Sequence, residues 1–402
     1  MIKISPEIDY SWKCPYCLEV LPKGKIFWQG IHVGVKSVCK NCDEEIITDL
    51  PVGHAQYDSY IFDKKNNRLF GPATLSRVFF GLPFLHSLQQ PNPETVQMTI
   101  IKKKKISEAV IVNCLDYLYG HCLLKLFNVQ RHLKESSLPV VVIVPEFLVW
   151  AVPEAVSETW VVSLSLSQMK KFYPSLDDQI QNESKRFDQL YVSKAYSHPN
   201  QLKIEEYTGI KPHDWMSDKF RISFIWREDR PWFFSFPITY IFRKIGILSV
   251  LLWWQNWQVI WFMKKIQASL PEAKLTVTGI GKSTRFPDWI EDKRFEKPNP
   301  DTEKKLCKIY SESRVVVGVH GSSMLLPSAH AGGVVNLLPD DRLGNFAQDT
   351  MYHSINHSAD PRIISFLYRY LPINSKPAVV ASQAVSMVKN YSNILKYFHT
   401  SI

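Results

Sequence analysis

The stretch at residues 313–339, SRVVVGVHGSSMLLPSAHAGGVVNLLP, constrains the fold of this chain more than any other. Residues 314–319 are an almost continuous β-branched run, which is typical of a strand buried on both faces of a parallel sheet. The pattern then predicts a polar turn at 320–323, a helix over 324–331 and a second buried strand over 334–338. A strand, a helix and a strand in this order predict an α/β fold.

The predicted turn consists of small or polar residues at the carboxyl end of a strand and the amino end of a helix. Its members are His320, Gly321, Ser322 and Ser323. Open α/β sheets bind ligands at this edge. Backbone N–H groups and the helix dipole there favour a phosphate, so the turn is a candidate phosphate-binding element.

The alternation of strands and helices extends over most of the chain. Apolar runs predict further strands, and helical spacing predicts helices between them, at 109–113, 117–134, 139–144, 160–164, 189–193, 221–226, 245–267, 274–278 and 301–313. A polar stretch at 197–214 separates two such series. We therefore expect a small cysteine-bearing module at 1–50, an α/β domain at 51–205, and a second α/β domain with a helical tail at 206–402.

Three segments together resemble the family 61-type glycosyltransferases. The strand, His-Gly turn and helix at 313–339 resemble that family's signature. Residues 116–127 (DYLYGHCLLKLF) resemble its Tyr-Gly-His segment, and residues 221–227 (RISFIWR) resemble the strand and arginine that open its second half. The resemblance covers roughly residues 108–339, and the amino-terminal part departs from the family.

The resemblance implies a GT-B fold, with two Rossmann-like parallel-sheet domains and an active site formed from their carboxyl edges. It implies transfer of a sugar from a nucleoside-diphosphate sugar, with a UDP-sugar favoured, to a glycan, polysaccharide or lipid-linked acceptor. It further implies an inverting mechanism, in which one direct displacement occurs at the anomeric carbon. The first domain would bind the acceptor and the second would bind the donor.

The donor-binding residues are expected after three strands of the second domain. Two arginines in WREDRPW could form paired hydrogen bonds with a diphosphate, and a glycine pair followed by lysine offers close approach to a base or ribose. The predicted donor site comprises Arg227, Arg230, Gly279, Gly281, Lys282, His320, Gly321, Ser322 and Ser323. A structural salt bridge is the alternative role for Arg227.

An inverting transfer needs a base for the acceptor hydroxyl. His121 and Asp116 follow the first strand of the first domain and are the candidates that the family segment supports. Glu228 is a third candidate, and Asp229 beside it a fourth. His121 could instead cap its helix or pack in the core. Glu228 and Asp229 could instead serve as salt-bridge partners of the arginines, with no part in catalysis.

The chain contains no Asp-x-Asp pair, which metal-dependent sugar transfer commonly uses. Its adjacent acidic pairs, Asp177-Asp178 and Asp340-Asp341, are typical of surface turns. Because arginine and a helix end could stabilise the leaving diphosphate, we predict that the transfer needs no catalytic metal.

Four of the seven cysteines form two close pairs. Cys14 and Cys17 make one C-x2-C, and Cys39 and Cys42 make the other. Two such pairs supply four thiolates for one tetrahedral zinc ion, and a four-thiolate site leaves no open position for catalysis. The sequence therefore predicts a structural zinc in a zinc-ribbon-like module. The alternative is a metal-free hairpin with reduced cysteines.

The net charge of +10 and the pI of about 9.1 fit an anionic partner, such as a nucleotide-sugar, a lipid phosphate, a nucleic acid or a membrane surface. A generic basic surface is the alternative. Residues 1–10 lack a signal-peptide core, so we expect a cytoplasmic protein. The aromatic segment at 253–257 favours a core helix. The further aromatic stretch at 231–242 keeps peripheral contact with the inner membrane face as the alternative. A zinc-ribbon protein that binds nucleic acid or protein without transferase activity is the competing interpretation. Nucleic acid is disfavoured because the aromatics are not interleaved with Lys and Arg.

Overall fold

Long runs of Val, Ile and Leu form the central strands of two parallel sheets, as the sequence predicts. The computed structural model describes residues 1–194, 202–297, 299–351 and 361–399. The chain divides into two units, Met1–Pro199 and Asn200–Ile402. The division falls close to the expected domain boundary at residue 205. Within the described residues, α-helices alternate with parallel strands in both units, which confirms the α/β class.

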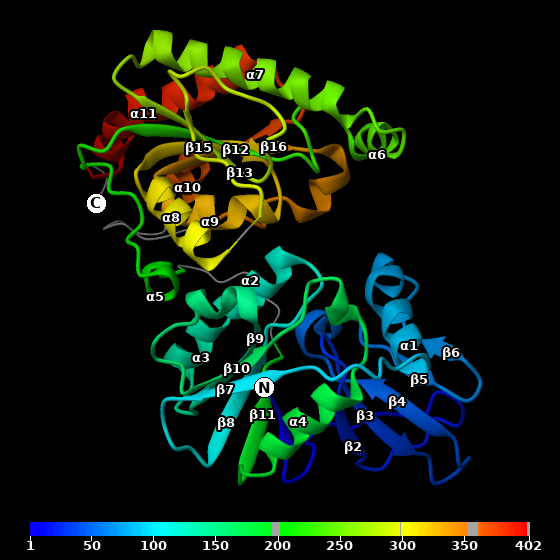
Figure 1. Cartoon of the computed structure of the whole chain (residues 1–402). Helices are drawn as coiled ribbons and strands as arrows, with labels where there is room; N and C mark the ends of the chain where they lie inside the picture. Colours follow the sequence, from blue (N-terminus) through cyan, green and yellow to red (C-terminus); the bar gives the residue numbers. More distant parts are fainter. Residues whose placement is uncertain (195–201, 298, 352–360, 400–402) are drawn as a thin grey trace. The chain divides into compact units, whose positions relative to one another are not determined.

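The second unit contains a six-stranded sheet in which every described pairing is parallel (Figure 1). Its strands lie in the order β14-β13-β12-β15-β16-β17. They are β12 (Arg221–Trp226), β13 (Lys274–Gly279), β14 (Glu291–Asp292), β15 (Ser313–Val319), β16 (Gly333–Leu338) and β17 (Tyr368–Pro372). Counted along the chain, this is the order 3-2-1-4-5-6 of the doubly wound dinucleotide-binding sheet. The chain thus reverses direction in the sheet between β12 and β15.

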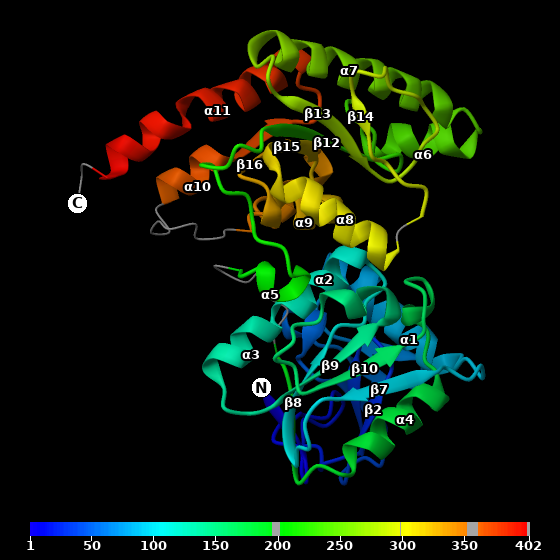
Figure 2. The same cartoon turned by 60° about the vertical axis from the view of Figure 1, so that its left-hand side comes forward.

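Helices cover both faces of this sheet (Figure 2). The helices of the second unit are α5 (Glu205–Thr208), α6 (Phe236–Lys244), α7 (Leu248–Ser269), α8 (Pro300–Ser311), α9 (Leu325–His330), α10 (Pro361–Leu367) and α11 (Pro377–His399). The long helices α7 and α11 pack side by side on one face, while α8 and α9 pack together on the other. Side chains such as Phe262 of α7 and Phe224 of β12 are fully buried between these layers.

The tail of the chain differs in part from the prediction. The sequence predicts helices with a proline-rich break between residues 371 and 377, and α10 and α11 are present. The segment between them begins earlier than expected and pairs with β16 as the edge strand β17. Its aromatic alternation, YRYLP, fits an extended edge strand.

The first unit contains a second six-stranded sheet, in the order β1-β11-β8-β9-β10-β7. The four central strands are parallel, and the two outer strands β1 and β7 are antiparallel to their neighbours. The strands are β1 (Ile2–Ser5), β7 (Met98–Lys102), β8 (Glu108–Asn113), β9 (Val140–Pro145), β10 (Glu158–Val162) and β11 (Gln189–Val192). The chain reverses direction between β8 and β11, so this sheet also has a switch point.

Two helices follow β8 where the sequence predicts one. The predicted helix over 117–134 divides into α2 (Tyr119–Phe127) and α3 (Val129–Glu135). Helix α2 packs on β8 and β9, and α3 packs on β9. A third helix, α4 (Pro174–Ser184), connects β10 to β11 and contacts the cysteine-bearing sheet.

The cysteine-bearing segment forms an antiparallel sheet within the first unit. Its strands are β2 (Lys25–Trp28), β3 (Val33–Val38), β4 (Glu45–Asp49), β5 (Ile61–Asp63) and β6 (Arg68–Phe70), and α1 (Leu82–Gln89) packs on it. The sheet continues past residue 50. The backbone N–H of Trp28 donates to Asp177 of α4 at 2.8 Å. The segment is thus built into the first unit instead of ending at residue 50.

Candidate functional site

The two switch points bring together residues from strands that are distant in sequence. In the second unit, Arg227 follows β12 directly, and His320 to Ser323 follow β15, its neighbour in the sheet. In the first unit, Asp116 lies three residues beyond the end of β8. Loops diverge at these carboxyl edges and leave space for a ligand. The sequence-predicted residues therefore lie where the topology favours binding.

Arg227 presents one unsatisfied nitrogen at its switch point. The guanidinium pairs with the carboxylate of Asp229, with Nε–Oδ1 at 2.9 Å and Nη2–Oδ2 at 2.5 Å. Its third nitrogen, Nη1, is buried and has no hydrogen-bond partner among the described residues. Leaving a buried donor on a charged group unpaired costs free energy. An anionic ligand that accepts from Nη1 would recover it.

The turn after β15 faces this nitrogen. A Cβ atom built on Gly321 would lie 2.7 Å from Arg227 Nη1, and the φ of Gly321 is +142°. Only glycine therefore allows the guanidinium to approach the turn without strain. Two residues further, Ser323 Oγ is also buried without a partner among the residues that the structure describes. Both unsatisfied atoms belong to residues predicted to bind the donor.

The helix after this turn is shorter than the sequence predicts. Residues Ser322–Met324 form one 3-10 turn, and α9 covers only Leu325–His330. A helix of this length adds little dipole to a binding site. The guanidinium and the hydroxyls are the stronger anion ligands here, with Ser322 exposed at the rim of the turn.

His320 is engaged within the fold. Its ring is buried, with Nε2 3.0 Å from the carbonyl oxygen of Asn345 and Nδ1 3.2 Å from Asp349 Oδ1. The Tyr370 hydroxyl donates to the same carboxylate oxygen at 2.9 Å. His320 thus fastens the segment after β16 to the sheet edge. This geometry favours a structural role for His320 over direct contact with a ligand.

Glu228 braces the neighbouring glycine loop. Its Oε1 accepts from the backbone N–H of Ser283 at 3.1 Å and from the Ser283 hydroxyl at 2.5 Å. A Cβ on Gly281 would lie 2.1 Å from the Glu228 carboxyl carbon, and one on Gly279 would lie 2.2 Å from the carbonyl oxygen of Trp226. Both glycines serve close packing of this loop. Since its carboxylate is occupied, Glu228 is better placed as a support than as a base.

The remaining predicted donor residues lie at the rim of the same edge. Arg230 Nη2 lies 3.3 Å from Asp341 Oδ2, and its guanidinium lies over the Phe236 ring at 5.5 Å. Burial, followed by the neighbouring Arg342, lowers the pKa of Arg230 from its ordinary value. Lys282 is exposed beyond the glycine loop.

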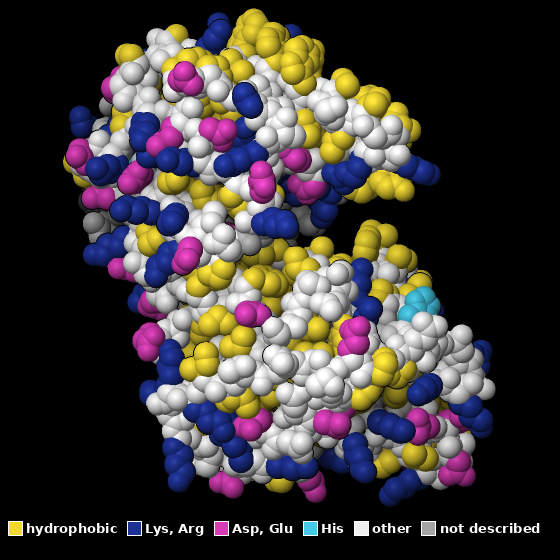
Figure 3. Space-filling model, viewed as in Figure 1, with side chains coloured by type: hydrophobic (Ala, Val, Ile, Leu, Met, Phe, Trp, Pro, Cys, Tyr) yellow, Lys and Arg dark blue, Asp and Glu magenta, His cyan; other side chains and the backbone are white. Residues whose placement is uncertain are grey.

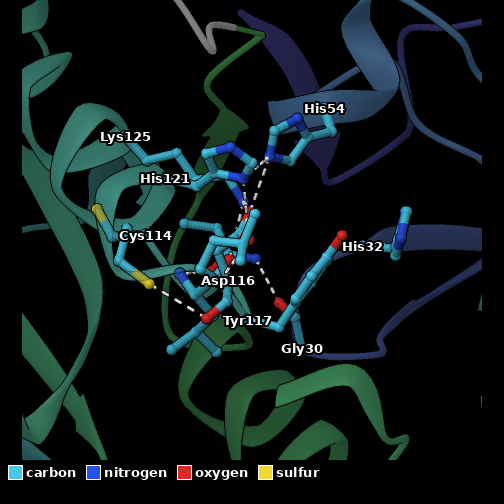
Figure 4. A network of polar contacts seen from close by, with 12 residues as sticks. Gly30, His32, His54, Cys114, Asp116, Tyr117, His121 and Lys125 are labelled. Carbon is cyan, nitrogen blue, oxygen red and sulfur yellow. Dashed lines mark hydrogen bonds and ion pairs between the residues drawn. The ribbon is translucent and has the colours of Figure 1, made fainter. Parts of the chain in front are cut away.

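A buried ionic cluster surrounds Asp116 in the first unit (Figure 4). The carboxylate is completely buried. Its Oδ2 lies 2.9 Å from Lys125 Nζ and 2.9 Å from His54 Nε2, and its Oδ1 lies 3.3 Å from His121 Nδ1. The two imidazoles also contact each other, with 2.9 Å between His54 Nε2 and His121 Nδ1. Three elements of the first unit therefore converge on one carboxylate.

The charges of this cluster nearly balance. Burial alone would raise the pKa of Asp116, but Lys125, with His121 and His54, holds the pKa of Asp116 well below its ordinary value. Burial lowers the pKa of His54 to about 4, so this imidazole is neutral near pH 7. The ammonium of Lys125 is itself buried and donates to the carbonyl oxygen of Leu115 at 2.8 Å. Asp116 and Lys125 thus form a neutral buried pair.

His121 is the member of the cluster nearest to solvent. Its side chain is 20% exposed, whereas that of His54 is 9% exposed. In the tautomer whose Nδ1 donates to Asp116, Nε2 carries the lone pair that a general base requires. Asp116 would orient the ring and stabilise the imidazolium. This histidine–aspartate arrangement suits proton removal from a hydroxyl group.

The same residues offer three ligand atoms within 4.8 Å of one another, which is compatible with a metal ion. The Lys125 ammonium opposes this use, because it already neutralises the carboxylate at 2.9 Å and would repel a divalent cation. Acid–base chemistry is therefore the better match to this donor set.

Two members of the cluster are absent from the sequence prediction. Lys125 interrupts an otherwise apolar helix, LLKLF, four residues after His121, and a lone lysine on a buried helix face signals a buried partner. His54 comes from a Gly- and Pro-containing stretch with no periodic pattern. Its ring stacks on Phe80 at 4.1 Å, a tertiary contact that no local pattern encodes.

The four paired cysteines lie together, as the sequence predicts. Their sulfurs are within 4.8 Å of one another, with Cys14–Cys42 at 3.6 Å and Cys17–Cys39 at 3.5 Å. Thiolates around a tetrahedral zinc at about 2.3 Å lie about 3.8 Å apart, so the donor set fits. In each pair the backbone N–H four residues after the first cysteine donates to that cysteine's carbonyl oxygen at 3.0 Å. The donor residues, Leu18 and Asp43, both have positive φ.

Comparisons with known proteins do not assign this chain. No protein-family model matches it, and a search of curated proteins finds no match.

We expect Lys125→Met to lower the free energy of unfolding by about 3–5 kcal/mol at pH 7, because Asp116 would remain buried without its cation. The folded-state pKa of Asp116 is depressed, so its contribution is present at neutral pH and is lost as the pH falls through the acid range. The difference in unfolding free energy between the wild type and Lys125→Met should therefore decrease as the pH is lowered. Urea unfolding at several pH values measures this difference.

The exposed pair Lys102–Glu183, at 3.2 Å, provides the control. Lys102→Met should change stability by less than about 1 kcal/mol. Asp116→Asn combined with Lys125→Met should recover part of the loss. Equal losses of stability in Lys125→Met and Lys102→Met would show that the buried pair contributes no more to stability than an exposed one.

We expect the purified protein to contain zinc in equimolar amount, measured by elemental analysis. Cys39→Ser should abolish the bound zinc and lower the melting temperature of the first unit, because the metal closes the ends of two hairpins. Cys307→Ser, a buried cysteine of α8, is the matched control and should leave the zinc content unchanged. Equal zinc content in both variants would contradict the assignment.

Proposed function

We propose that this protein is a glycosyltransferase of the family 61 type, with two Rossmann-like units in a GT-B arrangement. It would transfer a sugar from a nucleoside-diphosphate sugar, with a UDP-sugar favoured, to a hydroxyl of a glycan, polysaccharide or lipid-linked acceptor. The observation that carries the proposal is the buried, unsatisfied Nη1 of Arg227 beside Gly321 at a doubly wound switch point. A diphosphate has the charge and the oxygen atoms to satisfy it.

The second unit would hold the donor. Arg227 would donate to the diphosphate, with Asp229 fixing the guanidinium from the other side. The 321–323 turn would add its hydroxyls and N–H groups, and the braced loop at 279–283 would receive the base or ribose. Because the negative charge on the leaving diphosphate grows during displacement, a preorganised guanidinium stabilises the transition state more than the ground state.

The first unit would activate the acceptor. His121 Nε2 would remove the proton of the acceptor hydroxyl as its oxygen attacks the anomeric carbon, and Asp116 would stabilise the resulting imidazolium. The carbon–oxygen bond to the diphosphate breaks in the same step, so the anomeric configuration inverts. Glu228 and His320 would take no part in proton transfer, since both side chains are engaged within the fold.

The competing interpretation assigns the cysteine module to nucleic-acid or protein binding. The link from Trp28 to Asp177 and a second one from Gln29 Nε2 to the Lys170 carbonyl oxygen, at 2.8 Å each, join this module to the first unit. A module fastened in this way supports a structural role for zinc. We therefore place the function at the two sheet edges.

We expect one nucleoside diphosphate among UDP, GDP, CDP and dTDP to raise the melting temperature of the second unit without added divalent metal. Arg227→Ala should weaken that binding by about tenfold or more, since a hydrogen bond to a charged group contributes about 1.5–3 kcal/mol. Lys219→Ala, an exposed lysine before the amino end of β12, is the control and should bind normally. The donor site is wrong if none of the four nucleotides binds.

We expect His121→Gln to reduce the transfer rate by about 10²–10⁴-fold while leaving nucleotide affinity unchanged, because it removes the base and not a donor contact. The rate is measured as nucleoside diphosphate released in the presence of a glycan or lipid extract. His86→Gln, an exposed histidine of α1, should behave as the wild type. A full rate in His121→Gln would remove this residue from the mechanism.

A further inference from the structure

Helix α7 has two apolar faces. One face contributes Leu252, Val259, Phe262 and Ile266 to the core of the second unit. The opposite face, which we call the tryptophan face, consists of Val250, Trp253, Trp254, Trp257 and Trp261, all of them exposed. Trp253 is 65% exposed. The sequence predicts core packing or surface contact for this helix; one face packs in the core, and the other is free for a surface contact.

The exposed apolar surface continues onto α6 and the turn that joins it to α7. Tyr240, Ile241 and Ile245 are each more than half exposed. In the part of the chain that the structure describes, eleven of the 28 exposed large hydrophobic side chains lie between residues 236 and 261. Figure 3 shows hydrophobic side chains gathered over α7 and α6 on the second unit. So dense a concentration marks a binding surface.

The charged residues of the segment that forms this surface are all positive. Residues 231–270 contain Arg243, Lys244, Lys264 and Lys265 and no Asp or Glu. The two lysines follow Trp261 by three and four positions, so they flank the end of the tryptophan face. Lys265 Nζ lies 5.8 Å from the Trp261 ring centroid. Long basic side chains beside exposed tryptophans are typical of helices that lie in the interface of an anionic bilayer.

We propose that the second unit docks on an anionic membrane surface through the tryptophan face, α6 and the turn between them. Within the described residues, no helix has the length and apolarity needed to cross a bilayer, so the contact would be peripheral. A second copy is a poorer occupant, because a two-fold interface would place four cations against the same four cations without an acidic partner in this segment. Anionic lipid supplies the missing charge.

Docking would also position the proposed donor site. Gln255, on the buried side of α7, donates from Nε2 to the Arg227 carbonyl oxygen at 3.0 Å and accepts from the Trp232 N–H at 2.6 Å. The surface helix and the switch-point arginine are thus directly connected. If the proposed function also holds, on which this step rests, the acceptor is carried by a lipid.

The test is flotation of the full-length protein with phosphatidylcholine vesicles, with and without phosphatidylserine, in the absence of nucleotide. We expect binding at least tenfold stronger with the anionic lipid, since each basic residue near the surface contributes about 1 kcal/mol. Added salt should weaken it. Brominated lipid should quench tryptophan fluorescence. Because no nucleotide is present, failure here would leave the proposed function untouched.

Variants separate the two components of binding. Trp253→Ser with Trp257→Ser and Trp261→Ser should reduce binding more than tenfold, and Lys264→Glu with Lys265→Glu should remove the preference for anionic lipid. Met216→Ser, an 87% exposed apolar residue of the same unit, is the control and should bind normally. Unchanged melting temperatures verify folding. Absence of vesicle binding, equal binding to both lipids, or self-association that the tryptophan variant abolishes would overturn the proposal.

Discussion

The order of the parallel strands governs the arrangement of both candidate sites. A chain that adds strands first to one side of a starting strand and then to the other leaves diverging loops at the carboxyl edge. The first unit does so between β8 and β11, and the second between β12 and β15. Asp116 and Arg227 are the polar residues that follow the starting strands. Their positions are therefore consequences of topology as much as of local sequence.

Burial gives these two residues their chemical character. Asp116 remains ionised inside the fold because Lys125 is buried beside it, and burial lowers the pKa of His54 so that this imidazole stays neutral. Arg227 is held by Asp229 on two of its nitrogens and left unsatisfied on the third. A group that is fixed, desolvated and incompletely paired is costly for stability and suited to binding an opposite charge.

The central strands could be predicted from sequence because their β-branched runs need no tertiary information. Edge elements such as β17 could not, since an edge strand is only half buried and its pattern is weak. The cysteine pairs predicted their own clustering through spacing alone. In contrast, His54 reaches Asp116 through the fold of an irregular segment. The motifs predict a site role for Glu228 and His320 but carry no signal of Ser283 and Asn345, which engage these side chains. The position of a motif predicts which edge of the sheet carries a site, whereas tertiary packing determines which side chains at that edge are available to a ligand.

Helix α7 shows why composition alone could not separate a core helix from a surface helix. Apolar residues occupy every side of this helix, so its hydrophobic periodicity is weak. The burial of the polar residues Gln255 and Gln258, opposite exposed tryptophans, distinguishes its two faces. Gln255 is satisfied by backbone atoms at the switch point. On the opposite face, the Trp257 ring contacts those of Trp254 and Trp261, with centroids 5.6 and 5.3 Å apart. A helix that merely completed the core would lose nothing by carrying polar residues outward. Retaining four tryptophans there, at a cost in solubility, is consistent with a surface that binds an apolar and anionic partner.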